Sequence, residues 1–150
     1  MAELFHVGLT VSDCERSVAF YRDVVGMELE IQADHATPQF DELTSNPGAR
    51  LRVAHLRAGS FMLQVIQYLQ RGGPALDLHH NNIGSPHLAF FVPDVVAKYR
   101  DLKARGDVLI TSDLIVNGSK TLHSFYVEDP DGVPVEFLER LVPPSKDKAK

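Results

Sequence analysis

The stretch of residues 5–13, FHVGLTVSD, decides the fold because a second copy of it occurs later, as residues 86–94, PHLAFFVPD. Both copies have a histidine at their second position, a small residue at their fourth and an aspartate at their ninth. In the first copy apolar residues alternate with others, as in a half-buried β-strand. One face, which we expect to pack, carries Phe5, Val7, Leu9 and Val11, and the open face carries His6, Gly8 and Thr10.

The duplication extends beyond this strand. A helical pattern follows each copy, ending at Gly26 in the first half and covering about 95–105 in the second. Residues 63–67 then match residues 135–139 on the last strand of each half. We predict an α+β fold of two tandem βαβββ modules, with a long loop over residues 34–49. Residues 1–141 would form a single domain, with module one at about 4–70, a linker at about 71–84, module two at about 85–141 and a disordered tail at 142–150.

Composition limits the classes of function. The chain has 150 residues, of which 44% are hydrophobic, and a net charge of -5 with scattered Lys and Arg, so we expect neither nucleic acid nor a membrane as partner. No apolar run approaches membrane-spanning length and no leader pattern is evident, which predicts a cytoplasmic protein. The single cysteine, Cys14, is expected to be a semi-buried helix residue.

The duplicated positions predict a metal site. Each half supplies one imidazole at its first strand, His6 or His87, and one oxygen donor on its last strand, Gln64 or Glu136. Folded about a pseudo-two-fold axis, the four side chains would converge. Two neutral imidazoles, an amide and a carboxylate suit Zn, Ni, Co, Mn or Fe(II). The remaining histidines have no partner pattern and are left out of this predicted site; they are His35, His55, His79 and His80.

These residues resemble the vicinal oxygen chelate superfamily, which includes glyoxalase I, methylmalonyl-CoA epimerase, extradiol dioxygenases and bleomycin-binding proteins. The resemblance covers about residues 4–141 and rests on residues 6–13, 20–26, 87–90 and 129–137. It implies curved sheets around a metal ion, with ligands at the four positions named above. It also implies a small-molecule substrate and a homodimer.

The ligand set is similar to that of methylmalonyl-CoA epimerase. The resemblance implies a lyase or an isomerase/epimerase that acts by metal-stabilised enolate proton transfer on a small carbonyl compound, with Glu136 as both ligand and mobile base. One alternative is an Fe(II) extradiol-type ring-cleaving dioxygenase, with His123 and Tyr126 as acid–base groups beside the ligands. A second alternative is a non-catalytic drug-binding protein, although such relatives generally lack the metal set.

Two further residues near the predicted metal bear on the substrate. Bacterial glyoxalase I has an arginine four residues after its first histidine and an asparagine four residues after its first oxygen ligand. This chain has Thr10 and Tyr68 at those positions. Both departures argue against a glutathione thiohemiacetal as the substrate.

Overall fold

The computed structural model describes residues 1–141, so the predicted tail at 142–150 lies outside the described residues. The chain divides into two compact units, the first covering Met1–Leu76 and the second beginning at Asp77. This boundary falls inside the segment predicted as a linker. No helix within residues 1–141 is long and apolar enough to cross a membrane.

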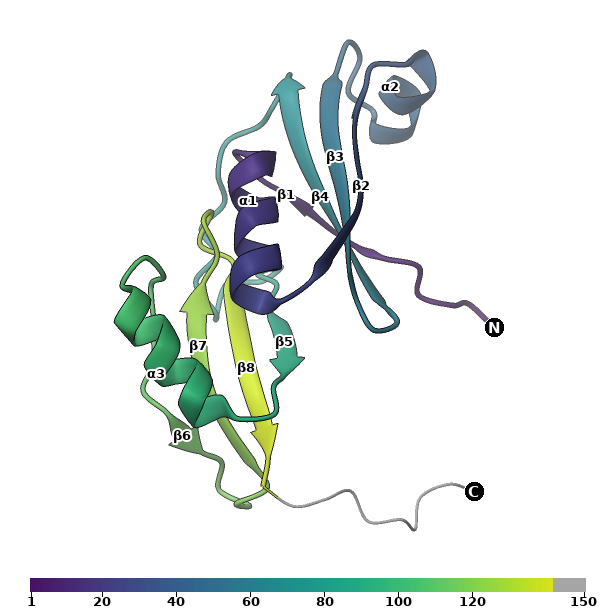
Figure 1. Ribbon diagram of the computed structural model, residues 1–150. Helices are drawn as coiled ribbons and strands as arrows, with labels where there is room; N and C mark the ends of the chain where they lie inside the picture. Colours follow the sequence, from purple (N-terminus) through teal and green to yellow (C-terminus); the bar gives the residue numbers. More distant parts are fainter. Residues whose placement is uncertain (142–150) are drawn as a thin grey trace. The chain divides into compact units, whose positions relative to one another are not determined.

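The first unit contains one four-stranded mixed sheet, drawn in Figure 1. The strand order is β1-β4-β3-β2, in which β1 runs parallel to β4 and the other neighbours are antiparallel. Its elements are β1 (Val7–Thr10), α1 (Cys14–Phe20), the π-helical turn η1 (Tyr21–Val25), β2 (Glu28–His35), α2 (Pro38–Thr44), β3 (Arg50–Ala58) and β4 (Phe61–Gln70).

The second unit repeats this topology. Its strand order is β5-β8-β7-β6, and β5 again runs parallel to the last strand. Its elements are β5 (Leu88–Phe91), α3 (Val95–Arg105), β6 (Ile115–Val116), β7 (Leu122–Glu128) and β8 (Pro134–Arg140). The predicted pair of βαβββ modules is therefore confirmed.

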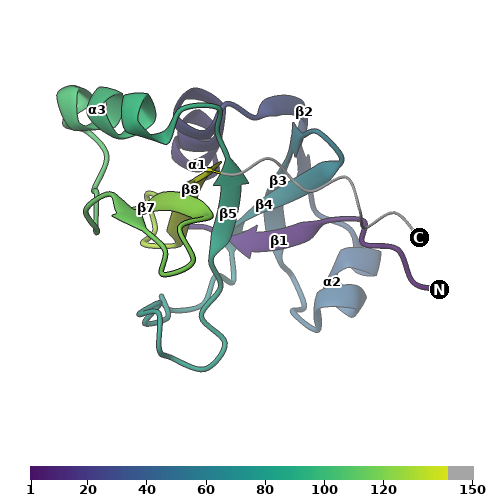
Figure 2. The same ribbon diagram turned by 90° about the horizontal axis from the view of Figure 1, so that it is seen from below.

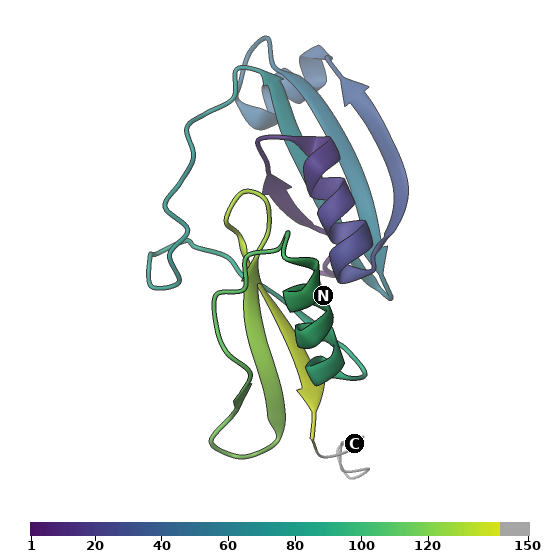
Figure 3. The same cartoon turned by 60° about the vertical axis from the view of Figure 1, so that its left-hand side comes forward.

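One long helix covers one face of each sheet. In the first unit α1 packs on the face that carries Leu56, Leu63 and Val65, all fully buried. The short helix α2 lies on the opposite side of this sheet (Figure 2). In the second unit α3 packs along β7 and β8 (Figure 3), over the buried rings of Phe125 and Phe137. The predicted donors lie on the faces that α1 and α3 do not cover.

The two long helices begin in the same way. Asp13 is the N-cap of α1, and its Oδ1 accepts a 3.0 Å hydrogen bond from the backbone N–H of Arg16. Asp94 is the N-cap of α3, and its Oδ1 accepts a 2.8 Å hydrogen bond from the N–H of Ala97. These bonds satisfy N–H groups that have no partner inside the helix. The aspartates of the duplicated stretch therefore set where each helix starts.

The last strand of each module also contacts its helix start. The N–H of Cys14 donates to Gln67 Oε1 at 3.0 Å, and the N–H of Val95 donates to Glu139 Oε2 at 2.9 Å. Both acceptors lie three residues after the predicted oxygen donor of their strand. The duplication therefore includes this contact, which ties each helix to the strand that carries the donor.

The prediction of a long loop over residues 34–49 is wrong. Strand β2 continues to His35, and α2 occupies Pro38–Thr44. The Thr37 side chain caps α2 by accepting from the N–H of Phe40 at 3.4 Å. Pro38 stands at the helix start, where its fixed φ suits a helix and its missing N–H costs nothing. Threonine followed by proline is a helix-start pattern that the many loop-forming residues around it obscured.

The predicted packing of Phe5 is also wrong. Strand β1 begins at Val7, and Phe5 before it is 69% exposed, with its ring edge-on to His6 at 5.1 Å. Leu9 and Val11 are 6% and 5% exposed, so the predicted face is buried only in its second half.

Cys14 is more deeply buried than predicted, because its exposed fraction is 0%. Burial, followed by the neighbouring charge of Glu15, raises the pKa of the thiol to about 11. At pH 8 only roughly one thiol in a thousand is then ionised, and the thiolate is the reactive form.

We expect Ellman's reagent to label Cys14 at least about 100-fold more slowly in the native protein than in urea. Equal rates in both conditions would contradict this environment.

Asp129 organises the turn between β7 and β8. The side chain is buried, and its Oδ1 accepts from the N–H groups of Asp131 at 2.9 Å and Val133 at 2.8 Å. Gly132 completes the turn with a φ of 84°, which favours glycine. This turn fixes where β8, the strand of Glu136, begins.

We expect Asp129→Ala to lower the free energy of unfolding by about 1–3 kcal/mol, because two N–H groups lose their acceptor. Urea denaturation measures this change. Asp129→Asn keeps an oxygen at the same place and is the matched control, with a smaller loss. The role assigned to Asp129 fails if the alanine variant is as stable as the wild type.

Candidate functional site

Gln64 lies on the open face of the first sheet, between two strands. It pairs with Gly8 on the parallel strand β1 and with His55 on the antiparallel strand β3. Residues paired across neighbouring strands point to the same face of a sheet. The half-buried side chains of Gln64 and His55 are therefore neighbours, and Gly8 adds no side chain on the other side.

His55 makes a hydrogen bond with Gln64. The Nε2 atoms of the two side chains are 2.9 Å apart. An amide nitrogen only donates, so the ring nitrogen of His55 accepts and the other ring nitrogen carries the hydrogen. Burial, followed by the neighbouring His6, lowers the pKa of His55 below its ordinary value, which keeps the ring neutral at pH 7.

The prediction that left out His55 missed this contact. The turn of the β3–β4 hairpin pairs Ala58 with Phe61. Counting back from that turn along both strands places His55 opposite Gln64. The position of the hairpin turn in the sequence therefore predicts this pairing.

His6 completes the group in the first module. Its ring centroid lies 6.3 Å from that of His55, with an angle of 26° between the ring planes. His6 Nδ1 is buried and has no hydrogen-bond partner among residues 1–141. Such atoms are rare in folded proteins, and a bound ion is one of the partners that would satisfy this one.

Gly8 leaves open space beside the oxygen of Gln64. A Cβ atom added at Gly8 would lie 3.8 Å from Gln64 Oε1 and 3.8 Å from Ile66 Cδ1. The amide oxygen therefore faces a place that a long side chain at position 8, such as that of leucine, would fill. The unpartnered His6 nitrogen and this space fit a ligand or metal ion on the open face.

The second module repeats the arrangement with other side chains. Glu136 pairs with Ala89 on the parallel strand β5 and with Tyr126 on the antiparallel strand β7. Tyr126 is hydrogen-bonded to Glu136. Burial, that hydrogen bond and the charge of Glu136 together raise the pKa of Tyr126 to about 12, so the phenol stays protonated and donates. His87 stands one residue before β5, and its ring centroid is 6.1 Å from that of Tyr126.

His80, which the prediction left out, also belongs to this group. Its ring contacts Tyr126 edge-on at 4.9 Å and lies 6.4 Å from His87. A hydrogen-bonded turn holds the segment around it: Asp77 Oδ1 accepts from the N–H of His79, and Asn82 Nδ2 donates to the carbonyl of Asp77. Nothing in the strand pattern indicates this contact, because His80 lies in the connecting segment.

The three other residues predicted to lie near the metal have different environments. Thr10 is exposed on the open face, two residues after Gly8, and Tyr68 packs against the cluster of Ala49, Leu51 and Val53. His123 pairs with Glu139 and alternates with Tyr126, so it lies on the face that α3 covers. Tyr126 therefore lies on the open face with Glu136, and His123 does not.

The donors occur as separate pairs. Among the described residues 1–141, no three His, Cys, Asp or Glu side chains form a group that could hold a metal by themselves. The first module contributes an imidazole and an amide, and the second contributes an imidazole and a carboxylate.

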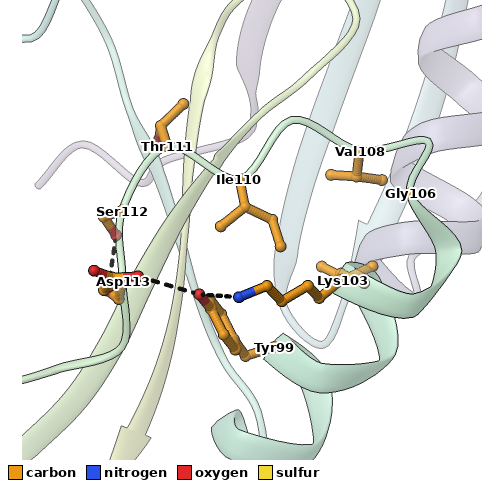
Figure 4. A pocket seen from close by; sticks show the side chains of 9 residues that line it. Tyr99, Lys103, Gly106, Val108, Ile110, Thr111, Ser112 and Asp113 are labelled. Carbon is orange, nitrogen blue, oxygen red and sulfur yellow. Dashed lines mark hydrogen bonds between the residues drawn. The ribbon is translucent and has the colours of Figure 1, made fainter.

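A cavity of about 450 Å³ lies elsewhere, beside α3, and Figure 4 shows its lining. Lys103 Nζ is 3.5 Å from the Tyr99 hydroxyl, which donates to Asp113 at 3.3 Å. Tyr99 also contacts Phe125, on the face opposite to Glu136. The cavity contains none of the predicted donors.

Residues 3–137 match the model of the Glyoxalase/Bleomycin resistance protein/Dioxygenase superfamily. The chain belongs to this superfamily. The match spans both modules, including all four predicted donors. The resemblance drawn from the sequence is thereby confirmed.

Several superfamily members are similar over most of their length. Lactoylglutathione lyase of Haemophilus influenzae is 29% identical over 139 residues, covering 91% of this chain and 92% of the relative. A probable lactoylglutathione lyase of Vibrio cholerae is 26% identical, covering 91% and 89%. Among solved structures, a glyoxalase family protein from Bacillus cereus has a TM-score of 0.84 at 16% identity, covering 95% of this chain and 96% of its own. This likeness shows the shared fold.

Filling the space beside Gln64 should change metal affinity and protein stability in different ways. We expect Gly8→Leu to keep or raise the free energy of unfolding, because glycine weakens a strand interior. The same variant would lose divalent-metal affinity by about tenfold or more, because its side chain covers the amide oxygen. Isothermal titration calorimetry with Zn²⁺ measures the affinity.

Gly8→Ala is the control, since its Cβ makes only ordinary contacts and metal binding should stay near the wild-type value. Unchanged metal affinity in Gly8→Leu would show that this face is not where the metal binds.

Proposed function

We propose that this protein is a divalent-metal-dependent lyase or isomerase that moves a proton beside the carbonyl group of a small substrate. His6 and Gln64 of the first module and His87 and Glu136 of the second would hold the ion, which is Zn, Ni, Co, Mn or Fe(II). The observation that carries this proposal is the repeated placement of an oxygen donor beside a small residue in both modules.

The ion, when bound, would supply Lewis-acid stabilisation of negative charge on the substrate oxygen. The chain itself supplies the proton transfer. Glu136 is half-buried on the open face, where it pairs with Ala89 and Tyr126, so we assign it the role of base. The Tyr126 phenol donates to that carboxylate and holds it in one orientation.

The relatives named lactoylglutathione lyase support a lyase. Their substrate is one candidate for this chain, and the exposed Thr10 argues against it because a hydroxyl cannot neutralise the carboxylates of glutathione. We therefore propose a carbonyl substrate smaller than a glutathione adduct. We also propose that the chain acts as a homodimer in the cytoplasm.

The proposed function is tested by reconstituting the protein with each of the five metals. We expect one of them to bind and to support exchange of solvent deuterium into a carbonyl substrate, with the methylglyoxal–glutathione adduct included for comparison. Glu136→Gln should slow the exchange by about 100-fold or more, because the base is removed. NMR or mass spectrometry measures the exchange.

Glu139→Gln is the matched control, since its carboxylate faces α3 and contacts the N–H of Val95. Exchange in this variant should be near the wild-type rate. Oxygen uptake on catechols by the iron form would favour the ring-cleaving dioxygenase instead. Failure to bind any of the metals would favour a non-catalytic binding protein.

A further inference from the structure

We propose that His55 is a positioning residue that orients the Gln64 amide so that its oxygen, and not its nitrogen, faces the metal. This inference rests on the proposed function, in which Gln64 is a ligand. It assigns a role to a residue that does not itself hold the ion.

A glutamine side chain has two ends of similar shape, of which only the oxygen can bind a cation. An unrestrained amide presents either end. The accepting nitrogen of His55, 2.9 Å from Gln64 Nε2, selects one of them. The oxygen is then left on the side of Gly8, where an added Cβ would be only 3.8 Å away. The hydrogen bond thus aims the oxygen into the space that β1 leaves open.

The geometry distinguishes this role from direct ligation by His55. Its Nε2 already accepts from Gln64, and its other ring nitrogen carries the hydrogen. With Nε2 occupied by the Gln64 amide and Nδ1 carrying the hydrogen, His55 has no nitrogen lone pair left to hold an ion.

The second module supports the inference, because there the residue on the neighbouring strand is the hydrogen-bond donor and the oxygen ligand is the acceptor. At the position equivalent to His55 stands Tyr126, a donor, and its partner Glu136 is an acceptor. An amide whose oxygen must stay free needs an acceptor on its nitrogen, and a carboxylate needs a donor. Each module therefore has the neighbour that its own oxygen ligand requires.

The tautomer of His55 tests the inference in the metal-free protein. We expect NMR of histidine-labelled protein to show the hydrogen on Nδ1 of His55. In Gln64→Glu the amide donor is lost, and we expect the hydrogen to move to Nε2, where it can donate to the carboxylate. Finding the hydrogen on Nε2 in the wild-type protein would overturn the inference.

Metal affinity gives the second measurement, with Cd²⁺ as the probe. We expect His55→Leu to bind about 10–100-fold more weakly, as is typical when the hydrogen-bond partner of a ligand is removed. His55→Gln offers an acceptor of similar reach and should restore most of the affinity. His35→Leu is the control, because His35 contacts Phe40 at 4.9 Å and does not touch Gln64.

Wild-type affinity in His55→Leu, or direct spin coupling between cadmium and the His55 ring, would overturn the positioning role. If the wild-type protein binds no cadmium, the proposed function fails instead. The tautomer of His55 in the metal-free protein then still decides whether this residue orients Gln64.

Discussion

The parallel pairing of the first and last strands in each module is the constraint on which the candidate site depends. It sets Gly8 beside Gln64 and Ala89 beside Glu136. Because side chains alternate along a strand, a slip of one residue would turn each oxygen donor toward the helix-covered face. Asp13 and Asp94, which start the helices, and Gln67 and Glu139, which contact the helix starts, oppose such a slip by fixing where each strand ends.

The two faces of each sheet contribute differently to stability and to the candidate site. The helix-covered face carries the continuous apolar core, including Leu63, Val65, Phe125 and Phe137. The opposite face of the first sheet carries a smaller apolar cluster that includes Leu51 and Val53, and it also carries the half-buried polar pair of His55 and Gln64. Gly8 shows the division most clearly, since a larger residue there would strengthen the strand and close the space beside the amide oxygen. A residue that keeps space free at the candidate site, as Gly8 does, therefore contributes less packing to the strand.

The duplication made most of the fold predictable from the sequence. Two copies of one pattern locate the strands and the helix starts, because alternation and capping are local properties, and they indicate the four candidate donors. Helix α2 was missed because its threonine and proline also occur in loops. The hairpin register could have revealed His55, whereas His80 reaches Tyr126 from a connecting segment that no periodicity describes. Contacts made by irregular segments depend on tertiary packing, which a local pattern does not contain.

The two modules also differ in formal charge at matching positions. The first has amides, Gln64 and Gln67, where the second has carboxylates, Glu136 and Glu139. With neutral imidazoles, the four proposed ligands carry a single negative charge, so a divalent ion would leave one positive charge unbalanced. A site with this electrostatic imbalance favours an oxygen atom that becomes anionic during reaction. A glutamate at position 64 would make the loaded site neutral and remove that preference.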